Sequence, residues 1–210
     1  MAEQFDKEFW DDRYGSQSAI WSGNPNVNLV AEASELAPGS ALDVGSGEGA
    51  DAIWLAQRGW QVTGTDISTV ALERAATHAE QAGISGIEWL RADLMQPWDP
   101  PQTYDLISAQ YMHLPTVQRT ALFRTLAGTV APHGTLLIVG HHPSDMETLM
   151  KRPNVPDLFF TGDDVAALLD PAEWEVVTNA AAPRPAHVHD EDITIHDAVF
   201  RARRISAGGR

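Results

Sequence analysis

The sequence predicts an α/β protein, a three-layer sandwich whose mostly parallel seven-stranded sheet ends in an antiparallel strand. Three observations predict this class. Strand-like and helix-like hydrophobic patterns alternate between residues 40 and 140, as they do in βαβ units. A glycine-rich loop at 45–49 follows the first of these strands. Two more strand patterns follow without a helix pattern between them, which favours an antiparallel hairpin at the sheet edge.

The alternation defines the elements in order. The segments that read as strands are 40–44, 60–65, 87–92, 104–109, 134–140, 174–180 and 192–203. The helix patterns between the first five of them are 49–58, 69–82 and 117–130. Within 69–82, apolar residues recur at helical spacing from Ser68, a good N-cap, to the stop signal at Gly83.

Two helix patterns precede the first strand. Residues 3–14 carry aromatic side chains at helical spacing, and 27–36 reads as a second helix capped by Asn26. We expect a single domain, because 210 residues suffice for one sizeable core. Its parts are an N-terminal helical cap at 1–39, a core at 40–204 and a flexible tail at 205–210.

The rhythm changes after residue 140. Residues 141–160 form an irregular segment with His, Pro, Met and Phe, and we expect its part at 143–160 to be a wall or lid. A short helix at 163–169 follows, with Thr161 and Asp164 placed as a capping box. A loop rich in Pro, His and Asp separates the last two strands. Its histidines raise the question of a metal, but the loop lies away from the expected site, so no metal is predicted.

The composition limits the classes of partner. The formal net charge is −15, from 14 basic and 29 acidic residues, which disfavours nucleic acid and anionic membranes. The chain has no cysteine, so disulfides and thiolate metal sites are excluded. Neither a signal-peptide pattern nor a membrane-spanning stretch is present, so we expect a cytoplasmic protein, as a monomer or homodimer.

Acidic residues recur where predicted strands end. Asp43, Asp66 and Asp93 each follow a strand, and the carboxyl ends of adjacent parallel strands line one crevice. Asp66 is placed to accept hydrogen bonds from both ribose hydroxyls, and Asp93 from the amine of an adenine. Asp43 would repel a pyrophosphate at the entrance of the glycine loop, so it suits a ligand that presents a cation or an amine there.

These residues form a recognisable order. Asp43-Val-Gly-Ser-Gly-Glu-Gly49, then Asp66, Asp93 and Tyr104-Asp-Leu-Ile-Ser-Ala, resembles class I methyltransferases, which have a Rossmann-like fold and use S-adenosylmethionine. The resemblance covers roughly residues 20–200. The opening Phe9-Trp-Asp-Asp-Arg-Tyr14, followed by Trp21, is similar to the small-molecule branch that includes tellurite-resistance and thiopurine methyltransferases.

The resemblance implies a set of cofactor contacts. The methionine part of S-adenosylmethionine is expected over Gly45, Ser46 and Gly47, with its ammonium near Asp43 and its amino-acid end near Gln110. The ribose is expected on Asp66, the adenine between Ile67 and Leu94 with its amine on Asp93, and Trp21 over the cofactor.

The methyl acceptor is expected to be a small molecule. Residues after the fourth and fifth strands, with the lid and the N-terminal helix, are the candidates for its contacts: Tyr14, Tyr111, His141 and Phe159. His142 and His113 are the candidates for a general base, which is needed only if the acceptor loses a proton. Each histidine could instead have a structural role, His113 as a cap for the helix that follows and His142 in satisfying loop carbonyls.

Two other functions stay open at this point. Gly45-x-Gly47-x-x-Ala50 also satisfies a permissive dinucleotide fingerprint, with an acid about 20 residues further on, which is the pattern of an NAD(P)-dependent oxidoreductase. Asp43 and Asp93 count against that interpretation. A non-catalytic protein that binds S-adenosylmethionine is the second alternative.

Overall fold

A computed structural model describes residues 6–16, 20, 22–150 and 155–205 of the chain. Its seven strands form one sheet in the order β3-β2-β1-β4-β5-β7-β6. The bounds of the strands are β1 Ser40–Val44, β2 Gln61–Asp66, β3 Glu88–Arg91, β4 Tyr104–Gln110, β5 Val130–His141, β6 Trp174–Val188 and β7 Glu191–Arg204. Strand β7 is antiparallel to both of its neighbours, whereas β1 to β5 pair in parallel. The predicted fold class is confirmed.

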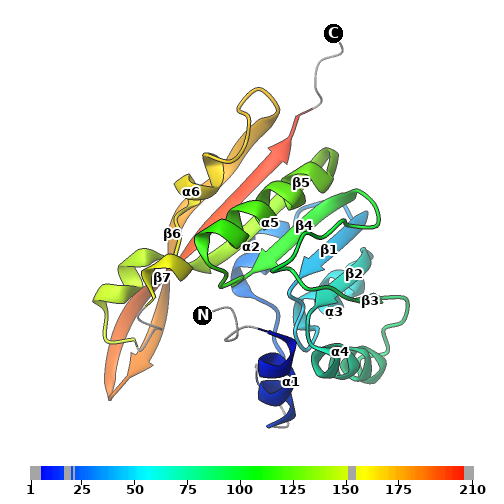
Figure 1. Ribbon diagram of the computed structural model, residues 1–210, viewed down its shortest axis with the longest axis horizontal. Coiled ribbons are helices and arrows are strands. Elements are labelled where there is room, and N and C mark those ends of the chain that lie inside the picture. The colour runs from blue at the N-terminus through cyan, green and yellow to red at the C-terminus, as the bar shows by residue number, and fades with distance from the viewer. Residues whose placement is uncertain (1–5, 17–19, 21, 151–154, 206–210) are drawn as a thin grey trace.

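Helices cover both faces of this sheet (Figure 1). The helices are α1 Lys7–Gly15, α2 Val27–Ala33, α3 Ala50–Gln57, α4 Thr69–Gln81, α5 Thr116–Thr129 and α6 Gly162–Ala166. One buried cluster joins α5 and α6 to one face of the sheet, and a second joins α2 and α3 to the other. Neighbouring strand residues divide between the clusters: Leu106 belongs to the second and Ile107 to the first. This is the period of two that a sheet with both faces covered requires.

Local sequence signals set the starts of these helices. Asn26 caps α2 through the N–H of Asn28 at 2.8 Å, and Ser68 caps α4 through the N–H of Ala71 at 3.1 Å. The capping box of Thr161 and Asp164 is present at α6. These three predictions are confirmed. The other element boundaries agree with prediction within a few residues, except that β5 begins earlier and β6 ends later than predicted.

The segment between the last two strands corrects a prediction. Instead of a loop between 180 and 192, β6 and β7 continue pairing until His187 faces Asp192 and Val188 faces Glu191. His189 and Asp190 both have positive φ, 50° and 64°, as a two-residue hairpin turn of type I′ requires. The prolines in β6 are tolerated because β6 is an edge strand. The tip of the hairpin projects beyond the rest of the sheet (Figure 1).

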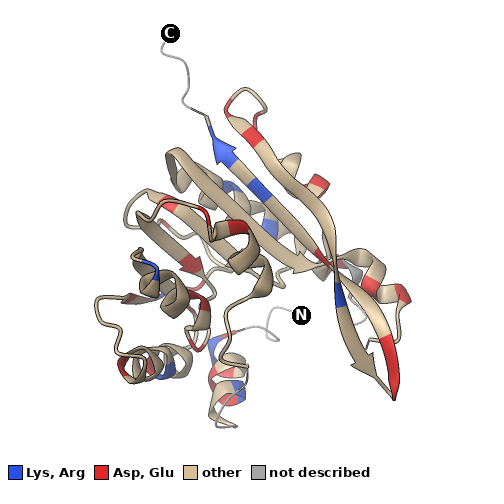
Figure 2. Ribbon diagram, turned by 180° about the vertical axis from the view of Figure 1, so that it is seen from behind, with Lys and Arg blue, Asp and Glu red and all other residues tan. Residues whose placement is uncertain are grey.

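The irregular segment after β5 is organised around two 3-10 helices, η2 Pro143–Glu147 and η3 Pro156–Leu158. Acidic side chains occur on α1 and at the hairpin tip alike (Figure 2), so the negative charge is not confined to one face. Among the described residues, no helix has the length and apolar character needed to cross a membrane.

Candidate active site at the carboxyl edge of the sheet

The glycine loop is held tightly between β1 and β2. The N–H of Ser46 donates to the carbonyl of Thr65 at 2.8 Å, and Gly45, Gly47 and Gly49 have φ of 72°, 52° and 87°. A Cβ at Gly45 would lie 2.5 Å from the sulfur of Met112. The positive φ therefore favours glycine here, and a Cβ would also displace Met112, which lies directly over the loop.

Asp43 brings a carboxylate into the same place from the interior of the sheet. Its exposed fraction is 2%, and its Oδ2 has no hydrogen-bond partner in the described part of the chain. Burial raises the pKa of Asp43 well above its ordinary value, and the nearby charge of Asp51 adds to the effect. A buried acid in this condition gains from a cationic partner, which would restore its charged form.

Asp66 connects the end of β2 to the glycine loop. Its carboxylate accepts from the N–H of Gly47 and from the N–H of Ser68, both at 2.9 Å. Burial raises the pKa of Asp66, and these backbone hydrogen bonds oppose that rise. Because each carboxylate oxygen has two lone pairs, the group can still accept from ribose hydroxyls.

Two acidic residues of the site were not singled out from the sequence. Asp51, in the first turn of α3, accepts from the N–H of Asn26 at 2.6 Å, and burial raises its pKa to about 6. Glu48 is buried and pairs with Arg74 at 2.9 Å while accepting from the N–H of Ile20 at 3.1 Å. Glu48 lies within the glycine loop and Asp51 directly after it, and this position is the signal that could have found them.

Three buried polar atoms around the loop lack hydrogen-bond partners among the described residues: Asp43 Oδ2, Ser46 Oγ and Gln110 Oε1. Gln110 ends β4, whose Ala109 pairs with Val44 beside the loop, and its Nε2 donates to Ser108 at 2.8 Å. Such atoms are costly unless a ligand satisfies them. The chemistry of the set, mostly acceptors, fits an ammonium group.

The remaining predicted cofactor residues lie along the same edge. Asp93 follows β3, and its Oδ1 accepts from the N–H of Met95 at 3.0 Å. Leu94 is buried and Ile67 is half-buried. Trp21 lies outside the described residues.

The N-terminal helix is attached beside Asp66. Asp11 of α1 accepts from the hydroxyl of Ser68 at 2.6 Å, at the start of α4. Tyr14, predicted to contact the acceptor, is buried in α1 and its ring lies 6.1 Å from that of Trp10. The helix therefore places Tyr14 on the Asp66 side of the edge.

A group of four rings, here called the ring wall, lies past the ends of β4 and β5: Tyr111, His113, His141 and Phe159. The His141 ring is 4.7 Å from that of Tyr111, 4.7 Å from that of His113 and 6.4 Å from that of Phe159. The structure thus brings together four residues predicted for the acceptor side. Tyr111 has φ of 52°, unusual for a side chain of this size, and its N–H donates to the carbonyl of Val139 at 2.7 Å.

His142 takes a different position. Its Nδ1 accepts from the N–H of Ser144 at 3.2 Å and lies 2.9 Å from the hydroxyl of Ser144, so the side chain caps η2. Its ring contacts that of His196, 6.4 Å away. Since Nδ1 accepts, the neutral ring carries its proton on Nε2 and has no second acceptor. This geometry gives the prediction of a base at His142 no support.

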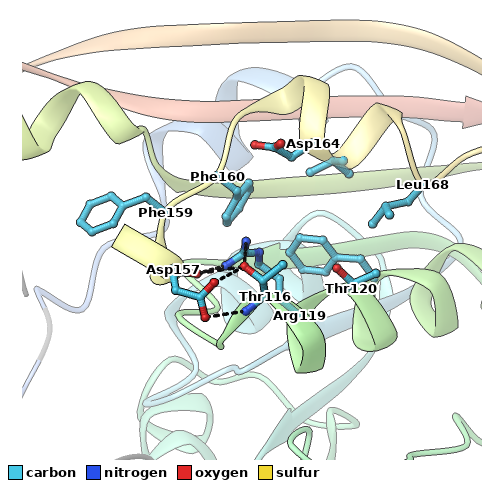
Figure 3. A pocket seen from close by; sticks show the side chains of 10 residues that line it. Thr116, Arg119, Thr120, Asp157, Phe159, Phe160, Asp164 and Leu168 are labelled. Atoms are coloured by element: carbon cyan, nitrogen blue, oxygen red, sulfur yellow. Dashed lines mark hydrogen bonds between the residues drawn. The ribbon is translucent and has the colours of Figure 1, made fainter. Parts of the chain in front are cut away.

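The alternative role predicted for His113, a cap for α5, is not seen, because α5 has no side-chain cap hydrogen bond at its start. The N–H of Thr116 donates to the carboxylate of Asp157 at 3.1 Å, and the buried Arg119 donates to the carbonyl of Asp157 at 2.6 Å (Figure 3). These contacts attach η3, and with it Phe159, to α5. A hollow of about 490 Å³ lies between α5, η3 and α6 and is not lined by the glycine loop.

Asp197 of β7 is a buried carboxylate behind the ring wall and was not singled out from the sequence. It accepts from Asn28 of α2 at 3.1 Å and from Nε of Arg184 at 3.0 Å, and it pairs with His141 in the register of β5 and β7. Burial acts to raise its pKa, but the contact with His141 and the hydrogen bonds from Arg184 outweigh it and lower the pKa of Asp197 to about 2. No local sequence signal marks it, because Asn28, Arg184 and His141 reach it from other elements.

Comparison with known proteins agrees with this geometry. Residues 41–134 match the model of a family described as a methyltransferase domain. The chain is 38% identical over 121 residues to an uncharacterized methyltransferase of Mycobacterium tuberculosis, over 57% of this chain and 59% of that protein. It is 30% identical over 131 residues to a ubiquinone biosynthesis O-methyltransferase of Saccharophagus degradans, over 60% of this chain and 54% of that protein. The chain thus spans less than two thirds of the length of both relatives.

A solved structure extends the likeness to the whole fold. The N-methyltransferase NodS from Bradyrhizobium japonicum, in complex with S-adenosyl-L-homocysteine, superimposes with a TM-score of 0.67 at 18% identity, over 93% of this chain and 98% of that one. The chain therefore matches a methyltransferase domain over residues 41–134 and has the fold of class I methyltransferases. The resemblance seen in the sequence is confirmed.

Proposed function

We propose that the protein transfers a methyl group from S-adenosylmethionine to a small-molecule acceptor. The observation that carries the proposal is the set of buried acceptor atoms around the glycine loop. Asp43 Oδ2, Ser46 Oγ and Gln110 Oε1 have no hydrogen-bond partners in the described chain, and they surround a loop that only glycine can form. A ligand ending in an ammonium group satisfies all three.

The other end of the cofactor fits the second acidic residue. Asp66 ends β2 and would hold the ribose, while Ile67 and Leu94 would enclose the adenine and Asp93 would accept from its amine. S-adenosylmethionine supplies an electrophilic methyl group on a sulfonium, so the chain need only align the acceptor and exclude water. The ring wall and Met112 supply apolar surface for both tasks.

A small acceptor is favoured over a macromolecule. The net charge of −15 disfavours nucleic acid, and the Saccharophagus relative is named for ubiquinone biosynthesis. The acceptor side consists of rings rather than a broad charged surface. We propose also that the protein is cytoplasmic and a monomer or homodimer, which cell fractionation and light scattering test.

Calorimetry with the purified chain tests the cofactor. S-adenosylmethionine and S-adenosylhomocysteine should bind, and NAD should not. The proposal would be overturned if neither S-adenosylmethionine nor S-adenosylhomocysteine bound. Binding of NAD alone would favour the NAD(P)-dependent oxidoreductase. Mass-detected turnover over phenols, thiols and amines then separates an enzyme from a protein that only binds the cofactor.

A further inference from the structure

The ring wall contains an imidazole that faces a buried carboxylate. His141 Nδ1 lies 3.9 Å from Asp197 Oδ1, and the two residues are register partners in β5 and β7. The distance is that of a charge contact rather than a direct hydrogen bond. Because the ring nitrogens lie on opposite sides of an imidazole, a proton held on Nδ1 by Asp197 leaves Nε2 as the acceptor.

Asp197 is fixed from several elements. Asn28 from α2 and Arg184 from β6 donate to it, and Tyr111 lies close enough to help lower its pKa. Its exposed fraction is 1%, and its pKa of about 2 keeps it ionised at every working pH. Asp145, which is buried, also faces Arg184 by charge. The carboxylate is therefore a fixed, charged anchor for whatever contacts it.

Tyr111 cannot serve as the base itself. Burial and the charge of Asp197 raise its pKa to about 12, so the phenol stays protonated. Its ring and that of His113 each lie 4.7 Å from that of His141 and 6.1 Å from each other, with His113 stacked on His141 at an interplanar angle of 22°. Flat rings with centroids 4.5–7 Å apart are the usual arrangement for aromatic stacking, so this wall suits a planar molecule.

We propose that His141, positioned by Asp197, accepts the proton of a planar acceptor that carries a phenol-type hydroxyl. The inference rests on the proposed function and deepens it. A lone pair of the acceptor oxygen forms the O–CH3 bond while the S–CH3 bond breaks. The electron pair of the S–CH3 bond stays on the sulfur, which becomes a neutral thioether. The hydroxyl proton moves to Nε2 of His141, and the resulting imidazolium faces the charge of Asp197. Total charge is conserved, because the imidazolium that forms replaces the sulfonium that is consumed. Asp197 is a positioning residue.

The test uses the full chain, with 4-methylcatechol and 4-methylthiophenol as probes at pH 8. The thiol is largely ionised there and needs no base, whereas the phenol does. His141→Gln should lower kcat for 4-methylcatechol by about 10²–10³-fold and for the thiol by less than about 3-fold. Asp197→Asn should reduce the phenol rate by about 10-fold or more, as loss of an orienting carboxylate does in other imidazole bases. The low-pH limb of the phenol profile should disappear in His141→Gln.

The exposed hairpin offers matched controls. His187 and Asp192 form a similar pair at 2.8 Å, far more exposed, so His187→Gln and Asp192→Asn should leave both rates within about 2-fold. Nitrogen-15 NMR of labelled histidine gives a readout besides activity: His141 should carry its proton on Nδ1 in the wild type and a mixture of tautomers in Asp197→Asn. If that variant does not fold, Asp197→Glu keeps the charge and takes its place.

The outcomes are distinct. Absence of S-adenosylhomocysteine binding to the wild type would defeat the proposed function. With binding intact, three results would each overturn the inference: methylation of the thiol but not the phenol, methylation of neither probe, or an unchanged phenol rate in His141→Gln.

Discussion

Asparagine at position 43 should make the protein more stable while weakening its cofactor binding. The carboxyl of Asp43 has an ordinary pKa of 3.8, and burial raises it well above that value. At pH 7 a buried carboxyl can destabilise the folded protein by no more than the cost of protonating it. For an ordinary pKa of 3.8 that cost is about 4 kcal/mol, at about 1.4 kcal/mol per pH unit. Asparagine has nearly the same shape and no charge to desolvate. We expect Asp43→Asn to raise the free energy of unfolding by about 1–3 kcal/mol and to weaken S-adenosylmethionine at least about 10-fold, because the ammonium loses its anion.

Urea unfolding and calorimetry measure the two effects. Calorimetry in buffers of different ionisation enthalpy should also detect more proton release on binding of S-adenosylhomocysteine by the wild type than by the variant, because the ammonium of the ligand favours the charged form of Asp43. Asp99→Asn, at an exposed position after β3, removes one negative charge without touching the site and serves as the control. A variant less stable than the wild type, or one that binds the cofactor equally well, would refute the reasoning.

The other predictions concern the loop, its neighbour and the lid. Gly45→Ala should lower the free energy of unfolding by about 1–3 kcal/mol and abolish cofactor binding, because φ is 72° and the new Cβ would lie 2.5 Å from the sulfur of Met112. Adding Met112→Ala should recover only part of this stability in urea unfolding. Full recovery would exclude the backbone contribution. Burial raises the pKa of Asp51 in the folded state from 3.8 to about 6, so the folded state binds this proton more tightly than the unfolded state does. The free energy of unfolding should therefore rise by up to about 3 kcal/mol as pH falls from 6 to 3.8. Asp51→Asn should flatten this dependence in urea unfolding measured over a series of pH values. Arg119→Met should cost about 1–3 kcal/mol, because the buried guanidinium holds the carbonyl of Asp157, and an unchanged Tm would contradict that role.

The fold could be predicted because its signals are local. The caps at Asn26 and Ser68 and the box at Thr161 and Asp164 each act within a few residues. The hairpin was harder, because prolines and histidines at 183–189 resemble a loop by composition. Pairing with β7, a long-range contact, decides that this segment is a strand.

The site divides in the same way. Asp43 and Asp66 could be found because each ends a strand beside a glycine loop, and parallel strands bring such ends together. Asp197 and Arg184 could not, because they meet across two antiparallel strands whose register no local signal sets. The sequence likewise favoured His142 over His141 as a base. His141 ends β5 and His142 caps η2, and only the structure shows that His141 is the one that joins the ring wall.

The two buried acids at this edge are opposites, and the difference assigns their roles. Asp43 and Asp197 are almost equally buried, yet the pKa of the first is raised and that of the second is lowered to about 2. Burial acts in the same direction on both, so the partners decide: Asp197 already has Arg184 and Asn28, whereas Asp43 Oδ2 has none in the described chain. An acid that lacks a cation within the protein is suited to a cationic ligand. An acid that already has one keeps its charge without a ligand and can orient a neighbouring imidazole. Pairs of acids whose pKa values are pushed apart by their surroundings commonly divide the work of an active site. Under the proposed function, Asp43 would serve the cofactor and Asp197 the acceptor.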